Sequence, residues 1–544
     1  LDVVGRVKID NYDNRSTYKA YASTGTLVSG DRGTYSDTST QSKNTYADAI
    51  ATLNKSFNDW SVNVNLGVSL SDSRYEMIGY EGGLKLINFF AVHNIDFNKA
   101  WKAKQSGWHD QTRAIFANAE IGWKSMIYLT ATGRNDWDSR LAFSDYKSFF
   151  YPSIGLSAIL TSMFNAPDWL TYLKVRGSYT EVGNSYGRFM TTVTYPYDEQ
   201  TQSWTSTSSY PNTKLKPERT KSWEVGLDAR ILNDISLNLT YYRSNTYNQT
   251  FYADLSLSSG YSNIPIQSGN IMNEGLEMSL GYNKQWKDFS FNTNYTLTWN
   301  KNRVKRLADG VYNYATGQPI QMPELSPLTY GHTDARLILR VGGSMGDVYG
   351  QRLLKRDLNG YILNEEGVGL AMENKETYLG SILPKMNMGW SLGFGYKGVN
   401  LGMTFTGRFG GIVISETQSV LDAAGVSKVS ADVRDAGGVQ INQSKVSAQT
   451  YYQTIQGTAA YYTYSATNVR LGELSLSYTL PKKWFDNKVG MTVGLVGKNL
   501  WMIYCKAPFD PELTTSAASN FYQGFDAYML PSTRNFGFNV KFQF

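Results

Sequence analysis

Strict alternation of apolar and polar residues, in segments of about ten residues, is the feature that most constrains this chain. Between residues 60 and 70, apolar side chains occupy every second position, and Ser, Asn and Gly occupy the positions between them. Segments 235–241, 289–300 and 535–544 repeat this pattern. Because successive side chains of a strand point to opposite faces, each segment predicts a β-strand with one apolar and one polar face.

The length and composition of these segments favour membrane-spanning strands. A strand of a soluble protein is usually five or six residues long, whereas a tilted strand needs about ten residues to cross a bilayer. The polar faces are rich in Asn, Ser, Thr and Gly rather than Lys and Glu. This pattern is typical of a barrel with apolar side chains toward lipid and polar side chains toward the lumen. A soluble β-sandwich is the alternative for any single segment.

Tight turns alternate with long polar insertions along the chain, as in outer-membrane barrels. The tight turns lie near 58–59, 124–125, 233–234, 287–288 and 397–398. The long insertions lie at about 13–42, 75–109, 183–218, 304–385, 410–467 and 500–531. About sixteen strands result: 1–12, 43–57, 60–74, 110–123, 126–136, 148–161, 172–182, 219–232, 235–250, 271–284, 289–303, 386–397, 400–409, 468–480, 488–499 and 532–544. If the last strand ends in the periplasm, every short turn falls on the periplasmic side.

Composition excludes several other classes of protein. The single Cys505 allows no disulfide framework and no CxxC site. A net charge of +6 over 544 residues, without a basic block, does not support nucleic-acid binding. No apolar run approaches the roughly 18 residues of a transmembrane helix. The abundant Trp and Tyr fit aromatic girdles at the membrane interfaces, and we expect Trp60, Trp223, Trp390 and Tyr241 there.

Motifs along the whole chain resemble the C-terminal barrel portion of SusC/RagA-type TonB-dependent outer-membrane transporters. They are GRNDW (133–137), FYPSIGLS (150–157), LKVRGSYTEVGN (173–184), LKPERTKSWEVGLD (215–228), LTYYRSNTYNQT (239–250), SGNIMNEGLEMSL (268–280), NKNRV (300–304), NVRLGELSLSYTLPKKW (468–484), GKNLW (497–501), APFDPE (507–512) and LPSTRNFGFNVKFQF (530–544). Any one of these motifs is weak evidence, but so many in the same order is strong.

The resemblance implies an all-β fold, a transmembrane antiparallel β-barrel with long extracellular loops. Residues 1–544 would be one TonB-dependent receptor β-barrel domain, about the last sixteen strands of a 22-stranded barrel that is filled by a plug. A sheet cut in this way would leave two unpaired edges in lipid. We therefore expect the plug and the first strands in a missing N-terminal part of the same protein.

The resemblance also implies the partners and the location. The protein would lie in the outer membrane of a Gram-negative, Bacteroidetes-type bacterium, in contact with outer-membrane lipid. A SusD-like surface lipoprotein would cap it, and TonB-ExbB-ExbD would act through the missing plug. Active import of oligosaccharides or oligopeptides, as the transporter subunit of a SusCD-like complex, is the expected function. The alternatives are a passive porin-like channel and a secreted β-rich glycan-binding protein.

Two groups of aromatic residues in the long loops are candidates for contact with substrate or with a partner. The first group is Tyr195, Tyr197, Trp204 and Tyr210, and the second is Tyr461, Tyr462 and Tyr464. Aromatic faces beside Asn, Gln and Thr suit the capture of a sugar or peptide. Packing of the long loops on themselves is the alternative.

No motif indicates an enzyme, a cofactor or a firmly supported metal site. GFGYKG (393–398) has the spacing of a dinucleotide loop, but it occupies a strand and its turn. DLNGYILNEEG (357–367) resembles a calcium loop with the wrong glycine position, so that Asp357 and Asn359 are weak calcium candidates. A hairpin turn at Asn359 and Gly360 is the alternative. The three histidines lack metal-ligand spacing.

Overall fold

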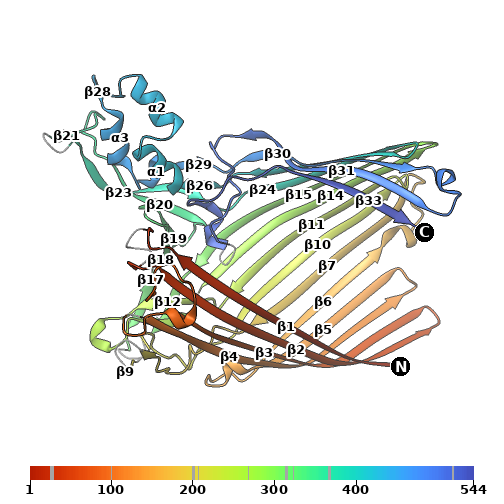
Figure 1. Ribbon diagram of the computed structural model, residues 1–544. Helices are drawn as coiled ribbons and strands as arrows, with labels where there is room; N and C mark the ends of the chain where they lie inside the picture. Colours follow the sequence, from red (N-terminus) through yellow and green to blue (C-terminus); the bar gives the residue numbers. More distant parts are fainter. Residues whose placement is uncertain are drawn as a thin grey trace. The chain divides into compact units, whose positions relative to one another are not determined.

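The computed structural model is almost entirely β-structure, built around one antiparallel sheet of sixteen strands that follow one another in chain order (Figure 1). The expected number and order of the strands are confirmed. The structure describes residues 1–24, 30–99, 101–198, 203–205, 207–267, 269–312, 317–322, 324–365, 369–516 and 520–544. None of the helices in these ranges is long and apolar enough to cross a membrane.

The sixteen strands of the large sheet have the following bounds. They are β1 (Asp2–Ala20), β2 (Thr34–Phe57), β3 (Trp60–Gly83), β4 (Trp101–Trp123), β5 (Ile127–Asp138), β6 (Phe149–Ile159), β7 (Leu170–Asn184), β10 (Glu218–Ile231), β11 (Ile235–Tyr247), β14 (Asn270–Trp286), β15 (Phe289–Arg306), β24 (Met386–Tyr396), β25 (Val399–Phe409), β30 (Asn468–Leu480), β31 (Gly490–Cys505) and β33 (Asn535–Gln543).

The tight turns adopt the left-handed backbone that two-residue hairpins require. Lys124 and Ser125 have φ of 50° and 54°, and Lys397 and Gly398 have φ of 46° and 90°. Asn58, Asn233 and Lys287 also have positive φ. These turns fall where the sequence places them, so the pairing of the strands that they connect is set locally.

Two of the expected insertions are largely strand, which corrects the sequence-based boundaries. β1 and β2 remain paired from Asp2↔Thr52 to Ala20↔Thr34, through most of segment 13–42. β3 and β4 remain paired as far as Gly82↔Trp101, within segment 75–109. The side chains of these extensions are mostly polar on both faces, because they lie beyond the apolar band. Period-two hydrophobicity therefore ends although the backbone ladder continues.

The two faces of β2–β5 differ sharply in composition. On one face of β3 an apolar row runs from Trp60 to Leu70, and the next two side chains on that face are Asp72 and Arg74. Ten steps of about 3.4 Å give roughly 34 Å along the strand, or about 25 Å at a tilt near 40°. This is the height of the apolar band of an outer-membrane barrel. We call this side the lipid face and the opposite side the lumen face.

Aromatic rings beside the tight turns mark one margin of the apolar band in unit 1, whereas the expected girdle residues of unit 2 lie inside their strands. The rings of Trp60 and Trp123, beside the tight turns, lie 6.5 Å apart, and Trp60 is 43% exposed. Trp223 lies 5.4 Å from Tyr241, and Trp390 lies 5.7 Å from Phe405. All of the expected girdle residues thus lie in strands and in contact with a second ring.

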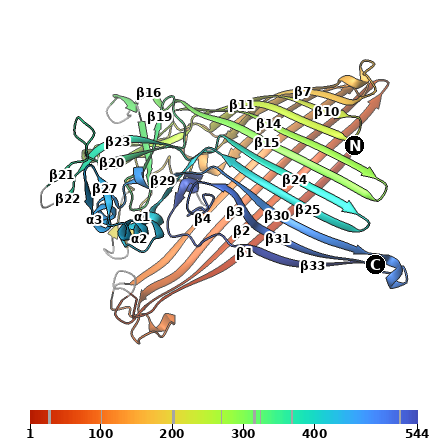
Figure 2. The same ribbon diagram turned by 90° about the horizontal axis from the view of Figure 1, so that it is seen from above.

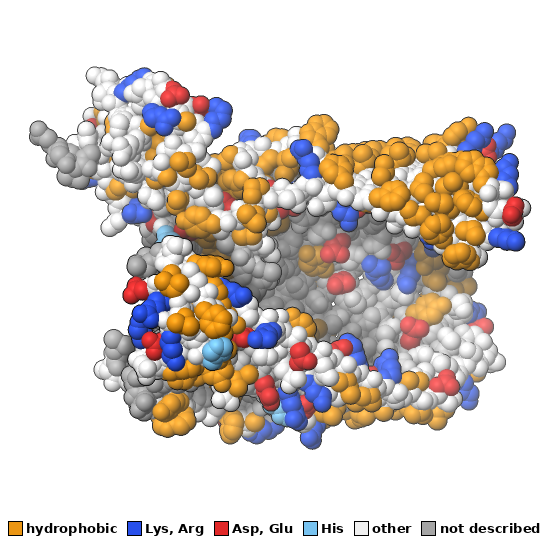
Figure 3. Space-filling view, viewed as in Figure 1, with side chains coloured by type: hydrophobic (Ala, Val, Ile, Leu, Met, Phe, Trp, Pro, Cys, Tyr) orange, Lys and Arg blue, Asp and Glu red, His pale blue; other side chains and the backbone are white. Residues whose placement is uncertain are grey.

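The chain divides into two compact units. Unit 1 comprises Leu1–Ser157, Ser178–Lys221 and Thr246–Ser268, and unit 2 comprises Ala158–Gly177, Ser222–Asn245 and Gly269–Phe544. In unit 2, hydrophobic side chains cover the surface over β31 and β33 (Figure 3). Phe536 and Phe538 of β33 are 80% and 71% exposed, as expected for side chains that face lipid.

The extracellular loops carry their own secondary structure, most of it in unit 2, where α1–α3 gather at one end of the strands (Figure 2). The loop helices are α1 (Glu416–Ala423), α2 (Lys428–Asp435) and α3 (Ala448–Ile455), with short 3-10 turns η1 (Val92–Asn94), η2 (Ser139–Leu141), η4 (Leu257–Ser259), η5 (Ala459–Tyr461) and η7 (Asn520–Gly524). The 3-10 turns η3 (Leu160–Ser162) and η6 (Lys482–Phe485) lie in the connections from β6 to β7 and from β30 to β31, on the side of the tight turns. The short strands are β8 (Tyr197–Asp198), β9 (Ser203–Trp204), β12 (Thr250–Asp254), β13 (Asn263–Gln267), β16 (Ala308–Tyr312), β17 (Pro319–Met322), β18 (Glu324–Thr329), β19 (Arg336–Arg340), β20 (Asp347–Leu354), β21 (Asn364–Glu365), β22 (Gly369–Leu370), β23 (Met372–Ser381), β26 (Ile412–Ser415), β27 (Val439–Ile441), β28 (Ser444–Val446), β29 (Thr463–Ser465) and β32 (Phe525–Asp526).

The well-packed interior lies in these loops rather than in the barrel strands. Tyr330, Leu337, Val348, Ile382 and Ile414 are fully buried in one cluster. A barrel wall exposes its apolar face to lipid, and therefore the closest packing of side chains occurs where the loops fold on themselves.

Candidate functional site

Three of the loop aromatics expected from the sequence lie exposed on one small ribbon in unit 1. β8 and β9 pair through Tyr197↔Trp204, and the two rings meet edge to face at 5.1 Å. Trp204 is 71% exposed, Tyr195 62% and Tyr197 49%. An aromatic surface of this kind, open to solvent, suits contact with a sugar ring or with a protein.

Tyr210 belongs to a different part of the same loop. Its ring meets that of Tyr261 edge to face at 5.1 Å, and its backbone N–H donates to the Asn263 carbonyl at 2.8 Å. Tyr210 is only partly exposed. It therefore links two loops of unit 1.

The second group of expected aromatics packs inside an extracellular core of unit 2. Tyr462 is 3% exposed and contacts a cluster that includes Leu354 and Ile455, against which Tyr461 and Tyr464 also pack. The Tyr461 hydroxyl accepts a hydrogen bond from the Leu354 backbone N–H at 3.1 Å. Burial raises the pKa of Tyr464 to about 12. Here the contacts match the alternative reading, a long loop that packs on itself.

Asp357 and Asn359 form a turn. The Asp357 carboxylate accepts the backbone N–H groups of Asn359 and Tyr361, both at 2.9 Å, and Gly360 has φ of 85°. The hairpin alternative for this segment is thus seen in the structure. Among the residues that the structure describes, no three His, Cys, Asp or Glu side chains are grouped to hold a metal ion.

Paired charges line the lumen face in unit 1, and sequence reasoning did not single them out. Arg6 donates two hydrogen bonds to Asp48, at 3.0 and 2.9 Å. In the same row of the sheet, Asp136 accepts hydrogen bonds from Arg134 at 2.7 Å and from the Tyr151 hydroxyl at 2.6 Å. The buried carboxylates are thus compensated, and the wall presents arginine and hydroxyl groups to a polar solute.

A stacked aromatic pair lies farther along the same face, beyond the level of the apolar band. The rings of Tyr75 and Trp108 are stacked at 5.7 Å, with 13° between their planes. The Arg188 guanidinium lies 3.6 Å from the centre of the Trp108 ring and donates to Asp110 at 2.7 Å. The arrangement offers a flat stacking surface with a cation held against it.

Unit 2 repeats the pairing of charges on its own strands. Arg176 donates to Asp228 at 2.9 Å and to the Thr240 hydroxyl at 2.7 Å, and Asn238 also donates to Asp228. Arg176 belongs to motif 173–184 and Asp228 to motif 215–228. Two motifs that the sequence could only place in order are therefore joined by an ion pair on adjacent strands.

A second pair of motifs meets at the extracellular end of β30. Arg470 is 9% exposed and donates to both carboxylate oxygens of Asp510, at 2.8 and 3.0 Å, and to Asn468. Glu512 lies 3.3 Å from the same guanidinium. Motif 468–484 and motif 507–512 thus form one buried ion-pair network. Sequence spacing carries no signal for this pairing, because 40 residues separate Arg470 from Asp510.

A polar cavity of about 590 Å³ lies in unit 2, with Asn302, Ser344, Asp347, Tyr378 and Gly380 among its lining residues. Asp347 accepts hydrogen bonds from the Ser344 backbone N–H at 2.8 Å and from the Tyr378 hydroxyl at 3.2 Å. Burial raises the pKa of the Asp347 carboxyl, although these two hydrogen bonds oppose the shift. Burial, together with the Asp347 charge, raises the pKa of Tyr378 to about 12.

The chain is similar in sequence to TonB-dependent receptors of two bacteria. The chain is 24% identical to the TonB-dependent receptor P3 of Formosa agariphila, over 92% of this chain and 52% of that protein. It is 25% identical to the TonB-dependent receptor SusC of Bacteroides thetaiotaomicron, over 44% of this chain and 22% of that protein. The chain spans about half the length of the first of these relatives.

A solved structure shows the same fold. The RagAB peptide transporter aligns with a TM-score of 0.74 and 19% identity, over 93% of this chain and 56% of that chain. A family model described as TonB dependent receptor-like, beta-barrel matches residues 5–500. Members of this family are outer-membrane transporters and receptors rather than enzymes. The sixteen-stranded sheet, its lipid and lumen faces and these matches lead to one conclusion: the chain belongs to the β-barrel family of TonB-dependent receptors.

Proposed function

We propose that the protein imports oligosaccharides or oligopeptides across the outer membrane of a Bacteroidetes-type bacterium, as the transporter subunit of a SusCD-like complex. The observation that carries the proposal is the polar lumen face in unit 1, where two buried carboxylates are paired with arginines. Asp48 pairs with Arg6 of the neighbouring strand, and Asp136 pairs with Arg134 of its own strand. Such a wall hydrates a passage and forms hydrogen bonds with hydroxyl and amide groups of a solute.

Energy for import would come through TonB, acting on a plug in the N-terminal part of the same protein. The TonB-dependent family of the barrel supports this mode of transport. A SusD-like lipoprotein would cover the extracellular mouth. The exposed ribbon of Tyr195, Tyr197 and Trp204 is our candidate for contact with the substrate or with this lid.

Uptake by cells that express the full-length protein tests the transport proposal. Labelled oligosaccharides and oligopeptides are supplied separately, with and without a protonophore, and in a strain that lacks TonB. We expect uptake of one class that stops in both energy-depleted conditions. Uptake that persists without TonB would instead indicate a passive channel, and recovery of the protein in the aqueous phase without detergent would indicate a secreted binding protein.

Replacing the three exposed aromatics tests the ribbon. The variant Tyr195→Ala, Tyr197→Ala, Trp204→Ala should reduce uptake by about tenfold or more, because stacking of aromatic rings contributes a large share of sugar and protein contacts. Tyr361→Ala is the matched control, since Tyr361 is also an exposed loop tyrosine, at 49%. Co-purification of the lipoprotein with each variant separates loss of the lid from loss of substrate contact. Equal uptake by both variants would exclude a role for the ribbon.

A further inference from the structure

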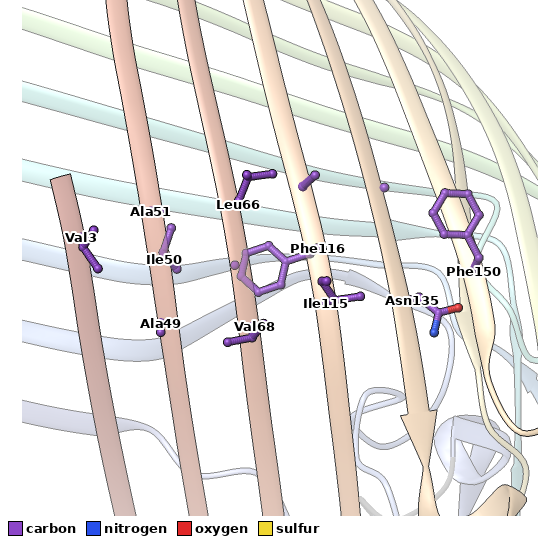
Figure 4. Close-up of a pocket in the computed structure, with 13 residues that line it drawn as sticks. Val3, Ala49, Ile50, Ala51, Leu66, Val68, Ile115, Phe116, Asn135 and Phe150 are labelled. Carbon is purple, nitrogen blue, oxygen red and sulfur yellow. The ribbon is translucent and has the colours of Figure 1, made fainter. Parts of the chain in front are cut away.

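An apolar groove runs across the lipid face of β2–β5 in unit 1. Its volume is about 540 Å³, and its lining includes Leu66, Val68, Ile115 and Phe150 (Figure 4). Leu66, Val68 and Ile115 are 57%, 52% and 53% exposed. The side chains of Leu66, Val68 and Ile115 belong to the apolar band, whereas Ile50 and Phe116, which also line the hollow, belong to the lumen face by their register. Most of the lining is on the lipid face, so the groove opens toward the hydrocarbon of the membrane.

The groove is hollow because small residues alternate with large ones across the strands. Leu66 lies opposite Ala51 on one side and Ala117 on the other, and Ala117 lies opposite Gly133. The floor is therefore low, while Leu66 and Phe150 rise beside it. A hollow of this kind, within the apolar band, fits an acyl chain, and Asn135, opposite Ile115, is the polar side chain in its lining.

Toward the extracellular ends of the strands, the groove continues into a second hollow of about 890 Å³, which has a polar end. The two hollows share Ala49, Val68 and Ile115, and the second also contacts Arg113 and Trp137. Arg113 lies opposite Leu70, the last apolar side chain of the band, and opposite Trp137. An indole and a guanidinium thus lie at the level of the lipid headgroups.

A row of basic residues crosses the lipid face closer to the extracellular ends of the strands than Arg113 and Trp137. Lys43 of β2 lies opposite Arg74 of β3, and Arg74 lies opposite His109 of β4. Like charges directly opposite in a sheet repel each other. Asp72 compensates in part, at 3.3 Å from Arg74 and 2.7 Å from His109. Lys43 is exposed and forms no ion pair with any residue in the described part of the chain.

A polar cleft of about 700 Å³ lies beyond the basic row, on the extended parts of β1–β4. Its lining on this face includes residues with hydroxyl, amide and carboxylate side chains, namely Asp13, Ser39, Gln41, Glu76 and Gln105. Ser39 lies opposite Ile78, and Gln41 lies opposite Glu76 on the same face. Side chains of these types accept and donate hydrogen bonds to sugar hydroxyls.

We infer that the lipid face of β1–β5 binds a phosphorylated glycolipid of the outer leaflet. The acyl chain would occupy the apolar groove, a phosphate would lie on Lys43, Arg74 and Arg113, and the sugar would extend into the polar cleft. The order of these three surfaces along the strands matches the order of the three parts of such a lipid. The phosphate would relieve the repulsion between Lys43 and Arg74, which Asp72 compensates only in part.

Native mass spectrometry of the full-length, detergent-purified protein tests the inference. The probes are bisphosphorylated lipid A, the same lipid after removal of its phosphates, and phosphatidylglycerol. In the Lys43→Gln, Arg74→Gln variant we expect roughly 30-fold weaker binding of bisphosphorylated lipid A, about 2 kcal/mol for two basic residues. Lys55→Gln is the matched control, because Lys55 is exposed on the same face of β2 but opposite Val62, within the apolar band.

A second variant tests the groove separately. Ala117→Phe places a large apolar side chain on its floor, which a lipid-facing position tolerates, and should weaken binding of both forms of lipid A. Equal binding of the phosphorylated and dephosphorylated lipids to the unmodified protein would overturn the phosphate site. Phosphatidylglycerol that binds as tightly as lipid A would overturn the assignment to a glycolipid, and unchanged binding to Ala117→Phe would overturn the groove.

Discussion

Arg470 shows how much of the architecture depends on single charged side chains outside the membrane. Its side chain is 11% exposed, that of Asp510 is 7% exposed, and the two form a bidentate pair. Charges removed from water to this extent are stable only together, because the loss of one partner leaves the other unpaired. The pair connects the extracellular end of β30 with the loop that follows β31.

Replacing one partner of this pair should cost more than replacing both. We expect Asp510→Asn and Arg470→Gln each to lower the free energy of unfolding by about 3–5 kcal/mol, and the double variant to lose less than the sum. Urea titration of the folded protein in detergent, read as a double-mutant cycle, measures the coupling. Arg340→Gln is a control, since the Arg340 side chain is 34% exposed. A coupling near zero would contradict a buried, mutually dependent pair.

The buried carboxyl group of Asp347 should make the stability of its surroundings fall as the pH rises. A carboxyl group whose pKa is lowered by folding has the opposite effect. Burial raises the pKa of this carboxyl group in the folded state. Its contribution to the stability of the fold is therefore complete below the pKa that the same group has in the unfolded chain. This contribution is lost as the pH rises through the raised pKa. We therefore expect amide exchange in β20 and β23, corrected for intrinsic rates, to show easier opening as the pH rises from 4 to 7.

Two variants isolate the effect of this carboxyl group. Asp347→Asn should flatten the dependence on pH, because the amide stays neutral. Asp357→Asn should leave the dependence unchanged, because that carboxylate lies in an exposed turn. A wild-type protein whose β20 becomes less stable in acid would contradict the raised pKa.

At the scale of strands, the extension of β2 to Thr34 was invisible in the sequence for a physical reason. Alternating hydrophobicity reports the contrast between lipid and lumen, and segment 34–42 lies beyond the apolar band. Its side chains are mostly polar, and Tyr35 packs against Leu84 and Ile95. Its backbone is nevertheless paired on two sides, since Thr38 lies opposite Ser16 and Gly79.

Exchange of the amide protons in this segment tests the extended ladder. The amides of Thr38 and Thr40 should exchange about as slowly as those inside the membrane-spanning part of β2, and far more slowly than those of segment 86–91. Thr40→Pro removes one donor and should speed exchange on both neighbouring strands, at a cost of about 3 kcal/mol. Fast exchange at both threonines in the unmodified protein would restore the loop that the sequence suggested.

The sixteen strands were predictable and the pairing of side chains was not, because the two depend on different information. Alternation is local, so the segment 60–70 could be assigned without any neighbour. The partner of Asp228 depends on which strand lies beside β10 and in which register, and the sequence leaves the register between distant strands open. The same limit applied to the loops, where Trp204 is exposed and Tyr462 is buried, although both lie in aromatic, polar segments.

For the molecule as a whole, the assignment of a lipid face and a lumen face predicts opposite tolerance to charge at adjacent residues. Ala131 lies opposite Ala119 on the lipid face of β5, and Thr132 lies opposite Asn118 on the lumen face. An arginine at the first position must enter hydrocarbon, whereas an arginine at the second enters a hydrated passage. We expect Ala131→Arg to cost about 2–4 kcal/mol and Thr132→Arg far less.

A urea titration compares the two variants directly. Each full-length variant is folded into lipid vesicles, and the folded fraction at each urea concentration is read from the heat-modifiable band on gels. They differ by one position on one strand, at nearly the same depth in the membrane, so differences in β-propensity largely cancel. If Thr132→Arg proved the more damaging, the faces would be inverted, and the paired charges of Arg6 and Asp48 would have to face lipid. Equal damage would contradict a membrane-spanning barrel, since only a bilayer makes one face of this sheet far less tolerant of charge than the other.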